Sequence, residues 1–136
     1  MSNYRLLLHR DAVRKFCRYI NFLGSSTEIQ KENNCPFDVL VDSKLRCEIK
    51  SATPRTVSGR VMWQFNLHRH NRVCLVGTDF YALYISGFRG FKYGTWLIIP
   101  YSEVPGRKKI FISERSLIFK WSKWFSRFDL IVNPAD

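Results

Sequence analysis

The sequence predicts a single α+β domain in which a run of strands lies between two helices. Three observations indicate this class: a helical pattern of apolar residues near the start, strand-like segments bounded by turn residues in the middle, and an aromatic helical pattern near the end. The chain has 136 residues, which suits one compact domain over residues 1–136. Because 46% of the residues are hydrophobic, intrinsic disorder is not expected.

The first predicted element is a helix over residues 11–23. Its apolar positions follow the i, i+3, i+4, i+7 spacing that turns one stripe toward a core. They are Val13, Phe16, Cys17 and Ile20. Asp11 is expected to cap the start of this helix, and Gly24 to end it.

The middle of the chain is predicted to form the sheet. Strands are expected over residues 27–31, 36–42, 45–51 and 61–67, with a loop over 52–59 where Pro54, Ser58 and Gly59 interrupt the pattern. The apolar residues 79–85 and 95–100 predict buried strands joined by the glycine-rich loop 87–94. Residues 110–112 could add a short strand, and residues 68–75 are ambiguous, with a short helix as one option.

The last predicted element is a helix that opens at Ser113 and Glu114. Its apolar side chains trace one continuous face, which is typical of packing against a core, with a protein–protein interface as the alternative. They are Leu117, Ile118, Trp121, Trp124, Phe125 and Phe128. The domain is therefore expected to end in a C-terminal amphipathic helix.

Charge is the first indication of function. The chain has 22 Lys and Arg against 11 Asp and Glu, a formal net charge of +11. Such an excess favours polyanionic partners, because each neutralised phosphate releases condensed counterions. The alternatives are a basic surface kept for solubility or contact with anionic lipid.

Membrane insertion and zinc binding are not expected. No apolar run approaches the roughly 20 residues that cross a bilayer, and the leucines near the start are too few for a signal peptide. The expected location is therefore cytoplasmic. The four cysteines, Cys17, Cys35, Cys47 and Cys74, contain no Cys-x-x-Cys pair. Cys17 and Cys47 fall on apolar faces, which predicts buried free thiols.

Two acids and a lysine form the candidate catalytic group. If residues 36–42 and 45–51 pair through a three-residue turn at Asp42-Ser43-Lys44, Asp38 lies opposite Glu48, roughly 5 Å away between Cβ atoms. Opposed carboxylates repel unless a cation compensates, and two carboxylates with open water positions suit Mg²⁺, with Mn²⁺ as a substitute. Lys50 shares the face of Glu48 and could orient or help deprotonate the attacking water, or offset charge on a phosphate. The alternative is an ordinary amphipathic hairpin with a solvated charged face.

This arrangement resembles the PD-(D/E)XK nuclease superfamily. Pro36-Phe37-Asp38 resembles the PD element, with one residue inserted, and Glu48-Ile49-Lys50 resembles the ExK element. The motif is short, and Asp42-Ser43-Lys44 is a second match that falls on the turn. The predicted order of elements is similar to the family's restriction-endonuclease-like α-β-β-β-α-β core, which implies a mixed central sheet flanked by helices.

The resemblance implies further site residues. Gln64 corresponds to a glutamine that several branches place near the metal, with a solvated sheet face as the alternative. Asp11 would be the first-helix acid that many members use as a metal-site group, with a helix cap as the alternative. Basic residues in loops around the site would contact DNA. They are Arg55, Arg60, Arg69, His70 and Arg72.

The sequence thus predicts a Mg²⁺-dependent endonuclease that hydrolyses phosphodiester bonds in double-stranded DNA. The resemblance is greatest to the homing endonucleases encoded in group I introns, which implies a homo-oligomer, a dimer or tetramer, because so small a domain reads a long site only by repetition. A Holliday-junction resolvase-like nuclease is one alternative. A non-catalytic nucleic-acid-binding module is the other.

Overall fold

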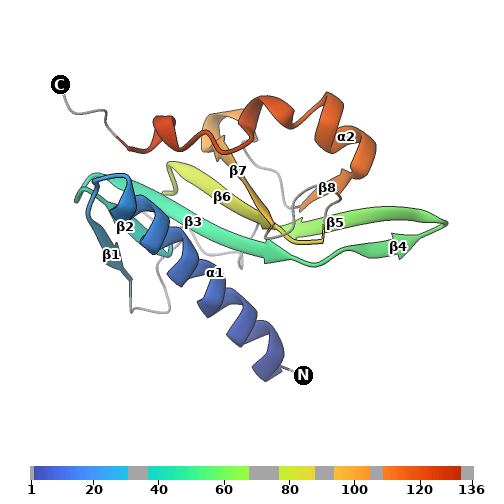
Figure 1. The fold of residues 1–136 in the computed structure, drawn as a ribbon, viewed down its shortest axis with the longest axis horizontal. Helices are drawn as coiled ribbons and strands as arrows, with labels where there is room; N and C mark the ends of the chain where they lie inside the picture. Colours follow the sequence, from blue (N-terminus) through green and yellow to red (C-terminus); the bar gives the residue numbers. More distant parts are fainter. Residues whose placement is uncertain (1, 31–36, 68–76, 88–93, 105–108, 133–136) are drawn as a thin grey trace.

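The computed structural model describes residues 2–30, 37–67, 77–87, 94–104 and 109–132. Helix α1 (Ser2–Phe22) lies across a five-stranded mixed sheet, and a smaller three-stranded sheet and helix α2 (Glu114–Phe119) lie beyond it (Figure 1). The large sheet has the order β1-β2-β3-β6-β7. Its strands are β1 (Thr27–Ile29), β2 (Val39–Val41), β3 (Leu45–Ala52), β6 (Phe80–Ile85) and β7 (Thr95–Pro100). This architecture confirms the predicted α+β class.

Strand β3 is the centre of the large sheet. It pairs antiparallel with β2 and parallel with β6, and the remaining neighbours in this sheet pair antiparallel. The second sheet has the order β4-β5-β8, with all pairs antiparallel. Its strands are β4 (Arg55–Val57), β5 (Arg60–Asn66) and β8 (Lys109–Ser113).

Two apolar cores cover the two faces of the large sheet. The first core joins α1 to one face, through α1 residues such as Phe16 and Ile20 and sheet residues such as Cys47 and Ile49. The second core joins the opposite face to the small sheet and α2, with Trp63 as its largest fully buried side chain. Because strand side chains alternate in direction, β3 contributes its odd-numbered residues to the first core and turns Glu48 and Lys50 the other way.

Helix α1 is longer than the sequence predicts. It begins at Ser2, so Asp11 is not a cap: it lies inside the helix, where its carboxylate is 3.2 Å from the Lys15 ammonium one turn later. The predicted end is confirmed, because the helix stops at Phe22 and Gly24 has φ of 101°. Cys17 and Cys47 are buried free thiols, as predicted.

The predicted loop 52–59 is wrong. Part of it is β4, which pairs with β5 across a two-residue turn at Ser58 and Gly59. These two residues have φ of 52° and 77°, as a type I′ hairpin requires. The turn residues in the sequence therefore mark the tip of a hairpin. The exposed strand β4 was not predicted because it lacks the apolar alternation by which a half-buried strand is recognised.

The C-terminal helix is shorter than predicted. Ser113 does cap it, accepting a hydrogen bond from the Ser116 amide, but α2 ends at Phe119 and short 3-10 turns follow at Ser122–Trp124 and Phe128–Leu130. Ser126, with φ of 47°, breaks any continuous helix. The apolar stripe is nevertheless mostly core.

The stripe reaches both cores because the chain changes direction at this break. Leu117 and Trp121 pack in the second core, whereas Phe128 packs in the first, beside Phe16 of α1. Over so few turns, a continuous helix and a bent segment that packs in two cores have the same spacing of apolar residues. The sequence pattern therefore does not distinguish these two structures, and the tertiary packing does.

Some expectations fall outside the described residues. The helix suggested for 68–75 is one of them, so the complete α-β-β-β-α-β order is not traced. Among the helices that the structure describes, none combines the length and the apolar character needed to cross a bilayer.

Candidate active site

Glu48 and Lys50 project from the same face of β3. Their register partners on β6 are Tyr81 and Leu83, which belong to the second core. Glu48 is only 3% exposed, and its Oε1 lies 3.7 Å from the Lys50 Nζ. A carboxylate this deeply buried is stable in its charged form only beside a cation and hydrogen-bond donors.

Glu48 affects the pKa of Tyr81 on the neighbouring strand β6. Burial first, and then the charge of Glu48, raise the pKa of Tyr81 well above its usual value. Tyr81 therefore stays a neutral phenol at neutral pH.

Asp38 is held against the backbone of β3. The register between β2 and β3 has the predicted three-residue connection, but its last pair is Val39 with Cys47, one residue short of the predicted pair of Asp38 with Glu48. The Asp38 amide instead donates to the Cys47 carbonyl (2.9 Å), and its Oδ2 accepts from the Ile49 amide (2.7 Å). The Asp38 carboxylate accepts the hydrogen bond of the Ile49 amide, which a backbone carbonyl would accept in a continuous ladder. Asp38 is therefore hydrogen-bonded to the residues before and after Glu48.

His9 is a site residue that the sequence analysis missed. Its Nε2 lies 3.4 Å from Asp38 Oδ1, so the first helix reaches the acids through a histidine. The signal was present, because His9 lies four residues before Val13 and extends the apolar stripe of α1 by one turn. It was missed because the helix was expected to begin at Asp11.

A pocket of about 370 Å³ opens beside Lys50 and His9. Its other wall comes from the β4–β5 hairpin, where Arg55 Nη1 donates to Gln64 Oε1 (3.1 Å) and Gln64 Nε2 donates to Asn66 Oδ1 (3.3 Å). Gln64 thus lies across the pocket from Lys50, near the predicted catalytic group. The pocket combines the cations of Lys50 and Arg55 with neutral hydrogen-bonding groups, which suits an anionic ligand.

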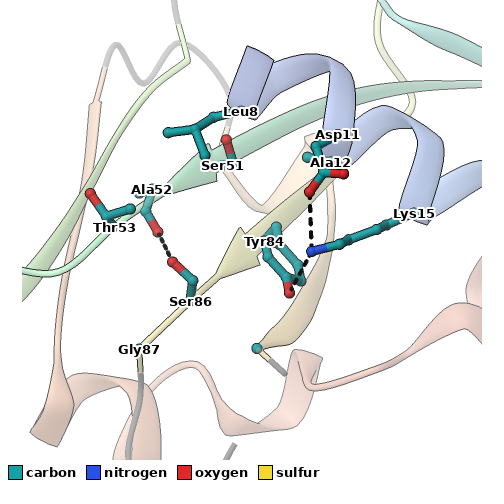
Figure 2. Close-up of a pocket in the computed structure, with 11 residues that line it drawn as sticks. Leu8, Asp11, Ala12, Lys15, Ser51, Ala52, Thr53, Tyr84, Ser86 and Gly87 are labelled. Carbon is teal, nitrogen blue, oxygen red and sulfur yellow. Dashed lines mark hydrogen bonds and ion pairs between the residues drawn. The ribbon is translucent and has the colours of Figure 1, made fainter. Parts of the chain in front are cut away.

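A second pocket, of about 490 Å³, adjoins the first and shares with it the wall formed by Leu8 and residues 51–53. Figure 2 shows Lys15 reaching from α1 toward Tyr84 on β6, with Asp11 beside it. The Lys15 ammonium is 3.2 Å from Asp11 and 3.5 Å from the Tyr84 hydroxyl. Asp11 therefore lines this neighbouring pocket, is paired with a lysine, and is not brought to Asp38 or Glu48.

The other predicted residues are distributed as follows. Arg60 lies at the exposed end of the β4–β5 hairpin. Arg69, His70 and Arg72 lie outside the described residues. The rival motif at Asp42-Ser43-Lys44 is a turn in which Asp42 Oδ1 accepts from the Ser26 amide (2.8 Å), so that carboxylate has a structural partner away from the pocket.

The chemistry of the donors can be compared with the needs of a metal ion. Among the residues that the structure describes, no three His, Cys, Asp or Glu side chains are grouped so as to enclose a metal by themselves. Mg²⁺ does not need such a cage, because it binds through one or two carboxylates and completes its shell with water and phosphate oxygens. Asp38 and Glu48 carry hard oxygen donors of the kind that Mg²⁺ prefers.

Known proteins were compared with the chain at the level of sequence and of structure. No family model and no curated protein matches the sequence. The fold is similar to that of a bacterial homing endonuclease, I-Ssp6803I. The two share 12% sequence identity, with a TM-score of 0.61 over 92% of this chain and 90% of the I-Ssp6803I chain. At this identity the likeness to I-Ssp6803I shows the fold alone.

Proposed function

We propose that the protein is a metal-dependent endonuclease that hydrolyses phosphodiester bonds in double-stranded DNA. The observation that carries the proposal is a pocket lined by His9, Lys50 and Arg55, in which His9 contacts Asp38 and Lys50 contacts Glu48, in a fold similar to that of I-Ssp6803I, a homing endonuclease. Charge supports it, because a net +11 attracts polyanions. By the same likeness, we propose sequence-specific cleavage of the homing type.

Each residue has a role that follows from its position. Asp38 and Glu48 would hold Mg²⁺, which when bound lowers the pKa of a water and polarises the phosphate. Lys50 contributes a fixed cation to the phosphate, where negative charge grows as the nucleophile adds. His9 holds Oδ1 of Asp38, and the Ile49 amide holds Oδ2, so the carboxylate is positioned before DNA arrives.

The opposite wall of the pocket supplies positioning. Arg55 is held by Gln64, so its guanidinium enters the pocket in a set direction and can clamp a phosphate. Asp11 belongs to the adjoining pocket, and in this proposal it orients Lys15 rather than binding the metal.

The test is cleavage of DNA by matched variants in Mg²⁺ and in EDTA. Glu48→Gln removes one negative charge with little change of shape, and Glu28→Gln on the exposed strand β1 is its control. We expect Glu48→Gln to lower the cleavage rate by roughly 100-fold or more while duplex binding remains, and Glu28→Gln to behave as the wild type. Thermal unfolding of both variants verifies that the fold is intact.

The substrates separate the competing functions. A randomised duplex library and a four-way junction are offered side by side. Preferred cutting of particular duplex sequences supports the homing type, and preferred cutting of the junction supports a resolvase instead. Binding without cleavage of either substrate, in Mg²⁺ or Mn²⁺, would leave a non-catalytic binding module and refute the proposal.

A further inference from the structure

The β4–β5 hairpin extends away from the body of the molecule (Figure 1). All of residues 55–60 are exposed, although they form a regular antiparallel pair closed by the tight turn at Ser58 and Gly59. A two-stranded ribbon with no core on either side of its tip gains little from burial. Such an arm is consistent with a surface that becomes covered when a partner binds.

The register of the hairpin defines its two faces. Directly opposed residues share a face, and the opposed pairs are Arg55 with Met62, Thr56 with Val61, and Val57 with Arg60. Trp63 and Phe65, one face of β5, are buried in the second core. The other face of β5 therefore carries Arg60, Met62, Gln64 and Asn66.

This second face connects the candidate active site to the tip of the hairpin. Gln64 lines the pocket beside Lys50, and Arg60 lies on the same face four residues nearer the tip. At about 3.3 Å per strand residue, the two positions are separated by roughly 13 Å. That spacing corresponds to about four base-pair steps of roughly 3.4 Å in a DNA duplex.

The two arginines of this face are held differently. Arg55 donates to Gln64 and points into the pocket, which suits a phosphate. Among the described residues, none forms a hydrogen bond or ion pair with the Arg60 guanidinium, and the cross-strand neighbour of Arg60 is the exposed apolar Val57. A guanidinium can donate two hydrogen bonds to guanine O6 and N7, and an apolar side chain can contact a thymine methyl group.

We propose that the β4–β5 hairpin enters the DNA major groove as a two-stranded ribbon and that Arg60 reads a guanine three to five base pairs from the cleaved bond. The major groove is wide enough to admit such a ribbon. The inference rests on the proposed function and adds the element that determines specificity. Arg60 is in this view a base-reading residue, whereas Arg55 is a phosphate contact.

The experiment selects bound duplexes from a randomised library with the Glu48→Gln protein in EDTA, where we expect binding to remain and cleavage to be suppressed. The same selection is made with the double variant Glu48→Gln/Arg60→Ala, and cleavage by the wild type locates the cut. We expect the preference for guanine at one position, three to five base pairs from the cut, to fall by roughly tenfold or more. Methylation of that guanine at N7 should weaken binding of Glu48→Gln but not of the double variant.

The control is Arg18→Ala, placed in the same Glu48→Gln background. Arg18 is exposed on α1, on a different element from the hairpin, and its loss removes the same charge. An unchanged base preference in the Arg60→Ala protein overturns the inference. A loss spread evenly over all sequences also overturns it, because that result means that Arg60 contacts phosphates.

The two proposals fail in distinguishable ways. If the wild type binds duplexes and cuts none, the nuclease proposal fails. The N7 methylation result still decides whether the hairpin reads the groove, with the position measured from the bound site. If the wild type cuts but Arg60→Ala keeps every preference, only the inference fails.

Discussion

Single side chains in this molecule act through the backbone of the strand next to them. Asp38 takes the Ile49 amide, and Asp79 in the same way accepts from the Arg46 amide at 2.9 Å and from its guanidinium at 3.1 and 3.3 Å. These carboxylates extend the hydrogen bonding of β3 beyond its ladders. Burial alone would raise the pKa of Asp79, but the hydrogen bonds from Arg46 outweigh it and lower the pKa below its usual value.

Asp79→Asn should therefore destabilise the protein in a pH-dependent way. A carboxyl whose pKa is lowered by folding stabilises the protein above its unfolded pKa of about 3.9, and this contribution is lost as the pH falls through the folded pKa. We expect the variant to lose about 1–2 kcal/mol of unfolding free energy at pH 7, with a smaller loss below pH about 3. Urea unfolding from pH 7 to 2 measures this, and a gap that stays constant with pH would contradict it.

Among individual residues, sequence analysis predicted which side chains share a face better than it predicted their contacts. The alternation of Cys47 and Ile49 with Glu48 and Lys50 predicted which side chains share a face, because a half-buried strand imposes a period of two. The interruption of the ladder at Asp38 was not predictable, since it depends on a side chain replacing a carbonyl. The contact of His9 with Asp38 joins α1 to the sheet, and no local pattern encodes such a distance.

At the scale of elements, two glycines with positive φ differ in the space that surrounds them. Gly59, at the tip of the hairpin, and Gly94, before β7, both have φ near 80°. A Cβ on Gly59 would meet nothing within 4 Å, whereas one on Gly94 would run into the ring and hydroxyl of Tyr84. Tyr84 cannot yield freely, because Lys15 lies over its ring and Trp96 packs beside it.

These positions form a matched pair of substitutions. Gly59→Ala should cost about 1–2 kcal/mol for the left-handed backbone alone. Gly94→Ala should cost about 2–4 kcal/mol, because overpacking against Tyr84 is added to the same backbone cost. Denaturant unfolding measures both, and Tyr84→Ala should cancel part of the Gly94→Ala effect. Equal losses for the two alanine variants would show that the contact with Tyr84 is unimportant.

Elements were predictable where burial imposes a regular pattern of apolar residues on the sequence. Exposed elements carry no such pattern and were missed. Strands β6 and β7, which are apolar on both faces, begin and end close to their predicted limits. Strand β4 was missed because all its residues are exposed, so its sequence carries no apolar alternation. The C-terminal stripe predicted Leu117, Trp121 and Phe128 correctly as core residues. It was wrong for the exposed Ile118 and for the continuous helix, because the segment serves two cores.

For the whole molecule, we propose a homo-oligomer, a dimer or tetramer, because a domain of 136 residues would read a long duplex site only by repetition. The end of α2 offers a surface for this contact, because Phe119 is 79% exposed and Ile118 beside it is more than half exposed. Phe22 at the end of α1 is 84% exposed and forms a separate patch with Tyr19. The two phenylalanines are therefore a matched pair.

Sedimentation of the wild type and two variants tests the assembly. We expect the wild type to sediment as a dimer or tetramer and Phe119→Ser to shift toward the monomer, because burying such a ring contributes about 1.5–3 kcal/mol per subunit. Phe22→Ser should sediment as the wild type does. A monomeric wild type, with and without DNA, would be evidence against the oligomer. A shift caused by Phe22→Ser alone would move the interface to α1.

The position of β3 between β2 and β6 has a consequence for the order in which the chain folds. β2 and β3 are joined by three residues, but the parallel partner of Cys47 is Phe80, and the whole β4–β5 hairpin lies in the connection between them. Nearby segments of a chain meet early in folding, whereas distant ones meet slowly because more chain entropy is lost. We therefore expect Glu48 to stay in contact with water until this late pairing encloses it, after β2 and β3 have already paired.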